Sequence, residues 1–225
     1  MAKIRPVARY ALKRQKYKGC ISKLLSGDCE WGDKDLKPLK DEIRKLLRVE
    51  QNEVCPYCQR IIIPERRNLN EHIEHVLDKS KAKYKKFSLT ASNLILACHG
   101  CNVEKGQKDL LNSGTPAPIY LRLIDLPFIW PHPCVDDMVR CVHKAPGPVY
   151  SPIEGSGKEA EAERMIKDLK LNDTRNIESR YGRLVERRDR IMTLLGRLAR
   201  INDEKSRRRM APLILENEKV AAALN

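Results

Sequence analysis

Aromatic residues and long apolar runs are both scarce in this chain of 225 residues. Phe, Trp and Tyr together make up 5% of it, which argues against a single-strand binder built on a platform of stacked rings. The chain has no run of 18 apolar residues, and no apolar stretch follows the basic N-terminal residues. The sequence therefore predicts neither a membrane span nor a secretory signal, and we expect a cytoplasmic protein without membrane contact.

Acidic residues are absent before Asp28, although basic residues are frequent there. The whole chain carries 44 Lys and Arg against 30 Asp and Glu, which gives a formal charge of +14. Residues 111–157 are close to neutral, so the excess lies on either side of them. This distribution favours a polyanion such as nucleic acid as the partner, with a solubilising basic tail as the alternative.

Cysteine spacing gives the most specific signal in the sequence. Eight cysteines in a chain expected in a reducing compartment favour metal ligands over disulfides. Two C-x-x-C pairs, Cys55 with Cys58 and Cys98 with Cys101, lie on either side of residues 59–97. Because two such pairs supply the four thiolates of a tetrahedral site, we predict a structural Zn²⁺. A redox pair or simply buried thiols are the alternatives.

The segment between the cysteine pairs predicts a strand, a basic loop, a second strand and a helix. Apolar residues in 69–77 recur with the period of a short strand, and residues 92–97 predict the second strand. Asn102 is expected to open a helix that ends near Gly106. The basic loop carries five lysines that are candidate nucleic-acid contacts: Lys79, Lys81, Lys83, Lys85 and Lys86.

These residues resemble the HNH endonucleases, whose ββα-metal module is often braced by a four-cysteine zinc site. The family pattern of an acid–His pair, a central Asn and an Asn on the helix matches Glu74-His75, Asn93 and Asn102. The run around His75 is similar to the HNH component (PtuB) of Septu-type anti-phage systems, which also occurs as a retron-associated effector. The match is specific over residues 55–106 and looser outside them. Asp78 stands where the family usually has proline.

The resemblance implies an α+β fold, with a ββα-metal HNH module between mainly helical N- and C-terminal extensions. It implies a metal-dependent endonuclease in which His75 is the general base and Asn93 orients it. Glu74 and Asn102 would bind the catalytic ion, with Mg²⁺ or Mn²⁺ expected. DNA is the favoured substrate and RNA the alternative. The resemblance also implies an ATPase partner subunit (PtuA-like) in a phage-defence complex, and the chain itself has no G-x-x-x-x-G-K-[ST] loop.

Two alternatives stay open at this point. Glu71-His72 is a second acid–His pair, but His72 and His75 would lie on opposite faces of a strand. We therefore assign the general base to His75 and keep His72 as an accessory catalytic residue. The alternative function, from a different class, is a non-catalytic zinc module that binds nucleic acid.

The sequence divides into four segments. Residues 1–54 form a basic arm and a helical lead-in, and 55–110 the HNH module. Residues 111–157 are a loop-rich packing or partner segment with a strand-like region around 135–142. Residues 158–225 are a helical C-terminal region, with helices predicted over 159–169 and 173–200. An apolar stripe on the second helix is expected to cover the nuclease core.

Overall fold

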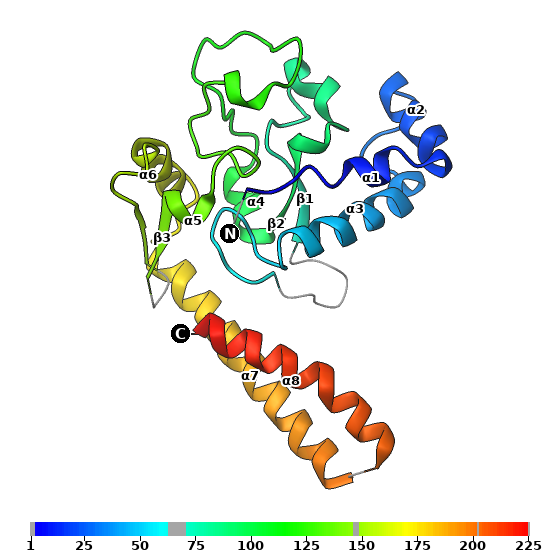
Figure 1. The fold of residues 1–225 in the computed structure, drawn as a ribbon, viewed down its shortest axis with the longest axis vertical. Coiled ribbons are helices and arrows are strands. Elements are labelled where there is room, and N and C mark those ends of the chain that lie inside the picture. The colour runs from blue at the N-terminus through cyan, green and yellow to red at the C-terminus, as the bar shows by residue number, and fades with distance from the viewer. Residues whose placement is uncertain (1–2, 63–70, 146–148, 202, 225) are drawn as a thin grey trace. The chain divides into compact units, whose positions relative to one another are not determined.

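The computed structural model describes residues 3–62, 71–145, 149–201 and 203–224, without the side chains of residues 176–180. The chain forms two compact units, of which the first comprises residues 1–143 and 151–169 and the second residues 144–150 and 170–225. Helices are combined with two-stranded sheets, as expected (Figure 1). Most of the first three predicted segments therefore belong to one unit, and the fourth is divided between the two. No helix in the described ranges is long and apolar enough to cross a membrane.

The N-terminal part of the first unit is helical. It contains α1 (Arg9–Leu12), η1 (Gln15–Tyr17), α2 (Lys18–Ser26), η2 (Lys34–Leu36) and α3 (Lys37–Glu50). The helical lead-in predicted before the first cysteine pair contains α3, which buries Leu39, Ile43 and Leu47 on one face. These residues recur every four positions, so they form a single stripe on the helix.

A strand hairpin and a short helix follow α3. Strand β1 (Glu71–His75) pairs antiparallel with β2 (Leu94–Cys98), and α4 (His99–Lys105) contacts both strands. The two strands and the helix were each expected, but α4 begins at His99 and not at Asn102. The cause is Cys98, whose extended backbone caps the helix, so that the second cysteine pair itself makes the first turn.

The connection between β1 and β2 is more regular than the predicted loop. It contains η3 (Ala82–Phe87) and η4 (Ala91–Asn93). Tyr84 and Phe87 are both buried, in a cluster with Leu77 and Leu111. A 3₁₀-helix repeats every three residues, so this spacing places both rings on the same side. Lys85 and Lys86 lie between these two anchors, and the other three lysines precede Tyr84.

The rest of the first unit contains η5 (Leu123–Asp125), α5 (Met138–Cys141) and α6 (Glu159–Asp168), together with most of β3 (Val142–Lys144) and of β4 (Tyr150–Pro152). The strand-like region predicted around 135–142 is wrong in part, because Asp137 caps a helical turn by accepting a hydrogen bond from the Val139 amide. Strand structure begins only at Val142. Helix α6 is held by Trp130, whose Nε1 donates to Asp168 Oδ2 at 3.0 Å.

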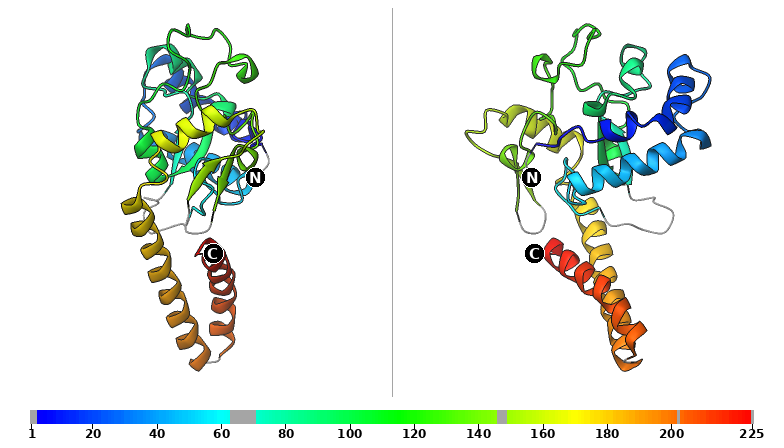
Figure 2. Two further views of the ribbon diagram at one scale, coloured as in Figure 1. Left: turned by 90° about the vertical axis from the view of Figure 1, so that its left-hand side faces the viewer. Right: turned by 45° about the vertical axis from the view of Figure 1, so that its right-hand side comes forward.

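The second unit is built around a helical hairpin of α7 (Thr174–Ile201) and α8 (Glu204–Leu224), which run side by side (Figure 2). Ile191 and Leu198 of α7 are buried, and Arg187 Nε donates to Glu216 Oε1 at 2.6 Å. Helix α7 confirms the prediction over 173–200, whereas α8 was not separately predicted. Within this unit the apolar stripe lies on a helix that packs against α8. Its first member, Ile177, lies outside the described side chains.

Candidate functional site

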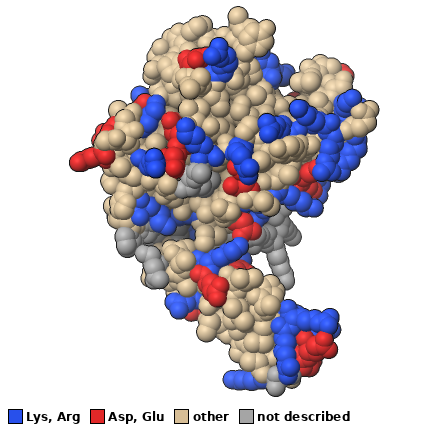
Figure 3. All heavy atoms as spheres, viewed as in Figure 1, with Lys and Arg blue, Asp and Glu red and all other residues tan. Residues whose placement is uncertain are grey.

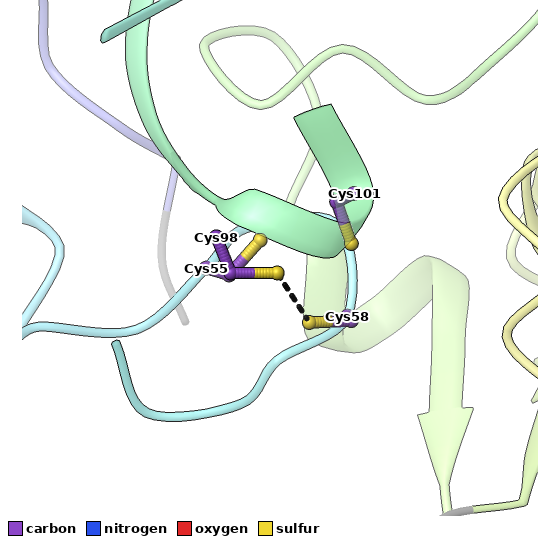
Figure 4. A group of neighbouring side chains, drawn as sticks. All are labelled: Cys55, Cys58, Cys98 and Cys101. Carbon is purple, nitrogen blue, oxygen red and sulfur yellow. Dashed lines mark hydrogen bonds between the residues drawn. The ribbon is translucent and has the colours of Figure 1, made fainter. Parts of the chain in front are cut away.

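The two cysteine pairs meet at one end of the hairpin. Cys55 and Cys58 come from the turn after α3, Cys98 ends β2, and Cys101 lies in the first turn of α4. All four sulfur atoms lie within 4.8 Å of one another, and they face a common centre (Figure 4). The Cys58 and Cys98 sulfurs are 3.7 Å apart. Tetrahedral zinc with Zn–S bonds of about 2.3 Å requires sulfur separations of about 3.8 Å, so the cluster fits that ion.

The protonation of this cluster also favours a cation. Burial raises the pKa of the Cys55 thiol well above its usual value, whereas hydrogen bonds from the neighbouring thiols, Cys101 first, lower that of Cys58. Three of the four cysteines are buried and Cys98 is half-buried, and a bound Zn²⁺ would stabilise their deprotonated sulfurs. The structure thus confirms that the two pairs assemble, and the identity of the ion stays a prediction.

Gln51 explains why the first cysteine pair reaches the second. It follows α3, is fully buried, and forms two hydrogen bonds of 2.8 Å with the backbone N–H and C=O of Leu96 in β2. Its Nε2 also donates to the Val54 carbonyl at 3.1 Å. The side chain therefore substitutes for a neighbouring strand and fixes residues 54–55 beside β2.

The two acid–His pairs of β1 occupy different surroundings. Glu71 forms an ion pair with Arg48, at 2.5 Å from Nη2. His72 Nε2 lies 3.0 Å from His99 Nδ1 at the start of α4. Residues 71–75 pair with β2 in unbroken register, so the chain does not bend between His72 and His75. The structure therefore places His72 with His99, apart from His75, and its accessory role stays a prediction.

His75 is buried and its ring is held in one orientation. Its Nε2 lies 3.0 Å from the carbonyl oxygen of Ser88, which can only accept a hydrogen bond, so Nε2 carries the proton and Nδ1 the lone pair. The Trp31 and His75 rings pack edge to face, with centroids 4.7 Å apart. Burial first, and the charge of Lys79 second, lower the pKa of His75 to about 3. The imidazole is neutral at neutral pH, as a proton acceptor must be, although burial also weakens it as a base.

Glu74 leaves the other face of β1, toward α4. Its carboxylate is buried, and Oε1 lies 2.5 Å from Lys105 Nζ while accepting no hydrogen bond of regular geometry from the described residues. Burial raises the pKa of Glu74, and the positive charge of Lys105 opposes this shift. Asn102 is half-buried one helical turn before Lys105. Carboxylate and amide oxygens are the donor types that Mg²⁺ and Mn²⁺ prefer, and the catalytic ion at Glu74 and Asn102 stays a prediction.

Asn93 connects the two strands just beyond His75. It is fully buried; its Oδ1 accepts from the Leu77 amide at 2.7 Å, and its Nδ2 donates to the carbonyls of Leu77 and Phe87. Its own carbonyl accepts from the Val76 amide at 3.0 Å. Asn93 thereby holds three backbone groups of the segment after His75: the Val76 amide, the Leu77 amide and the Leu77 carbonyl. This geometry suits the predicted positioning role, which stays a prediction.

Asp78 tightens the turn that follows. Its carboxylate accepts from the Ser80 amide at 2.9 Å and from the Ser80 hydroxyl at 2.6 Å. Burial raises the pKa of Asp78, but the Ser80 hydrogen bonds and the charges of Lys105 and Lys79 lower it below its usual value. Asp78 therefore stays ionised close to Glu74 and His75, and it adds a negative charge to that region.

The five lysines after β1 are not equivalent. Lys85 and Lys86 are exposed, whereas Lys79 and Lys81 are half-buried. Lys83 is neutralised within the fold, because its Nζ lies 2.7 Å from Asp109 Oδ2. Basic side chains also gather over α2 and the neighbouring α3, at the upper right of Figure 3. The predicted basic surface therefore has two exposed members in η3, and the N-terminal helices add to it.

Three residues that contact the acid–His pair were not predicted from the sequence: Trp31, Ser88 and Lys105. Trp31 and the Ser88 carbonyl contact His75 from distant sequence positions, and no local pattern signals either contact. Lys105 could have been found, because it lies three residues after Asn102 and so on the same helical face.

Comparisons of the chain with protein-family models, with curated proteins and with solved structures find no match.

Proposed function

We propose that this protein is a metal-dependent HNH endonuclease that hydrolyses phosphodiester bonds of nucleic acid. The observation that carries the proposal is the state of His75. Its Nε2 is committed to the Ser88 carbonyl, so the neutral ring offers a lone pair on Nδ1 in a fixed orientation. This ring sits at the end of a strand, in a strand–turn–strand–helix arrangement that also brings Glu74 close to α4.

Phosphodiester hydrolysis needs a deprotonated water and positive charge at the phosphate. His75 is the group that takes the proton of the attacking water at Nδ1. Glu74 and Asn102 would hold the catalytic Mg²⁺ or Mn²⁺, which when bound supplies positive charge to the phosphate oxygens. Asn93 keeps the segment after His75 in place through Leu77 and Phe87. The Asp78 carboxylate adds to the negative field that favours a cation.

The proposed partners are nucleic acid and an ATPase subunit. The basic residues of η3 and of the N-terminal helices would contact the phosphate backbone of DNA, with RNA as the alternative. An ATPase subunit and a role in phage defence rest on the resemblance to Septu-type HNH components. The structural zinc is proposed at the four cysteines, where it joins the α3–Gln51 region to α4.

A second candidate is a non-catalytic zinc module that binds nucleic acid, and two observations favour it. Lys105 engages the Glu74 carboxylate, and Trp31 covers His75, of which 5% is exposed. Under this alternative both residues serve only the packing of β1.

Cleavage decides between the two candidates. Purified protein is incubated with end-labelled DNA and RNA in parallel, with Mg²⁺ or Mn²⁺, with EDTA, and with or without a candidate ATPase. Metal-dependent products on either substrate support the nuclease. Binding without any cleavage under all of these conditions would favour the zinc module.

A further inference from the structure

Lys105 is the one lysine that is buried in the described part of the chain, with 2% of its surface exposed. Its Nζ lies 2.5 Å from Glu74 Oε1 and donates a hydrogen bond to the His75 carbonyl oxygen at 3.1 Å. The Glu74 and His75 side chains leave opposite faces of β1, yet a single ammonium contacts both residues. Lys105 thus links the acid–His pair to α4, the helix that carries Cys101 and Asn102.

The ion pair has a consequence for cation binding. A buried ammonium requires a paired negative charge, and here that charge is the carboxylate assigned to the divalent ion. An ammonium and a divalent ion cannot both occupy the same carboxylate oxygen, because like charges repel strongly where water is excluded. Binding of the ion at Oε1 of Glu74 therefore requires the displacement of Lys105 from that oxygen.

We propose that Lys105 is a positioning residue that occupies the Glu74 carboxylate until a divalent cation displaces it, and that it thereby sets the cation affinity of the site. The inference rests on the proposed function, because it takes Glu74 as an ion ligand. In the ion-free protein the ammonium neutralises the buried carboxylate and holds β1 against α4. Loss of the lysine charge should then make cation binding tighter.

A purely structural ion pair would behave differently. Removal of one partner would leave a buried charge without compensation and would lower the stability of the fold. The affinity for a divalent ion would stay unchanged, or would weaken as β1 loosened. The sign of the change in cation affinity therefore separates the two roles, and measuring it does not require catalysis.

The experiment measures Mn²⁺ binding to full-length, zinc-loaded protein without nucleic acid, from the electron paramagnetic resonance signal of free Mn²⁺. Mn²⁺ prefers oxygen ligands, so it should not displace Zn²⁺ from the four cysteines. Lys105→Met should bind Mn²⁺ at least about tenfold more tightly than the unaltered protein, because a competing charge is gone. Lys105→Arg keeps the charge and should restore the weaker binding. If Lys105→Met does not fold, Lys105→Gln replaces it, since its amide can still donate to the His75 carbonyl.

Lys108→Met is the matched control, because Lys108 follows α4 closely and forms an ion pair of 3.2 Å with Asp168. It should leave the Mn²⁺ affinity unchanged. If Glu74→Gln abolishes Mn²⁺ binding while Lys105→Met leaves it unchanged or weaker, the role of Lys105 is overturned and the ion site stands. If Glu74→Gln has no effect, or no protein binds Mn²⁺, both the role of Lys105 and the ion site of the proposed function are overturned.

Discussion

The cysteine cluster and the Glu74-His75 pair lie at opposite ends of the same two strands, and they differ in how completely the chain assembles them. Four like donors converge at the first, with sulfurs within 4.8 Å of one another. At the second, Glu74 and His75 point to opposite faces of β1, and a lysine and a tryptophan cover them. The cysteine cluster has the form of a closed structural site. The Glu74-His75 pair would have to lose one of these covering contacts before it could take part in the proposed reaction.

Because of this difference, we expect the cysteine cluster to contribute to stability and the Glu74-His75 pair to activity. The free energy of metal binding at the cysteines would contribute directly to the free energy of folding, because the metal would join the segment after α3 to β2 and α4. The acid–His pair, by contrast, is held by contacts that the protein makes itself, through Asn93, Ser88 and Lys105. Changes at the first site should therefore act on stability, and changes at His75 chiefly on activity.

The largest expected effect is on the fold itself. Cys55→Ser or Cys101→Ser should give insoluble or unfolded protein, because the zinc contribution of roughly 10 kcal/mol is as large as the stability of a whole domain. Cys20→Ser, at a half-buried cysteine outside the cluster, is the control and should remain soluble. Solubility, circular dichroism and elemental analysis measure the outcome, with one zinc expected per chain. Soluble, folded protein that contains no zinc would contradict the assignment.

Asn93→Ala should cost about 3 kcal/mol of unfolding free energy, because it leaves the buried backbone groups of Leu77 and Phe87 without partners. Urea unfolding measures the loss. Replacing the exposed Asn112 with Ala should cost close to nothing. A loss well below 1 kcal/mol for Asn93→Ala would show that the segment after His75 is held by other contacts.

Acid should destabilise the first unit through its buried histidines. His132 is 1% exposed, and burial lowers its pKa to about 3. Between the unfolded pKa of about 6.5 and pH 3, the unfolded chain binds a proton that the folded chain does not. The free energy of unfolding therefore decreases as the pH is lowered, by up to about 1.4 kcal/mol per pH unit. His132→Asn keeps an acceptor for the Cys134 amide and should make the slope shallower in urea unfolding from pH 7 to 4. An unchanged slope would contradict this cause.

The smallest effects concern nucleic-acid binding. Lys85→Gln and Lys86→Gln should each reduce the slope of log affinity against log salt by roughly 0.9 on duplex DNA, if each lysine neutralises one phosphate. Lys83→Gln is the matched variant and should change the slope less, because Asp109 already neutralises Lys83. Filter binding over a salt series measures all three. Equal slopes for the unaltered protein and all variants would show that η3 does not meet the phosphate backbone.

Features set by local patterns were predictable from the sequence. The helical lead-in predicted within residues 1–54 contains α3, and the two C-x-x-C pairs indicated the cluster. The strands of the hairpin were predicted within about two residues of their ends where described, and Leu69 and Asn70 lie outside the described residues. The segment predicted as a basic loop contains a 3₁₀-helix. Its lysines favour a solvated loop, but the burial of Tyr84 and Phe87 against Leu77 and Leu111 stabilises the helical turn.

Features that depend on distant contacts were not predictable. Trp31 reaches His75 from the segment between α2 and α3, and the Ser88 carbonyl does so through the path of the chain after η3. Neither contact leaves a periodic or paired signal in the sequence. The ion pair of Lys105 with Glu74 requires the register of β1 on β2 and the docking of α4, which only the assembled fold provides.

The most direct test of the central claim compares His75→Ala with His72→Ala in single-turnover cleavage of the labelled substrate, at saturating metal. We expect the cleavage rate of His75→Ala to fall by a factor of about 10² to 10⁴, as for the loss of a general base, while its fold and zinc content stay intact. His72→Ala should retain measurable activity, because the His72 ring pairs with His99 at the start of α4 and apart from His75. An active His75→Ala together with an inactive His72→Ala would contradict the account.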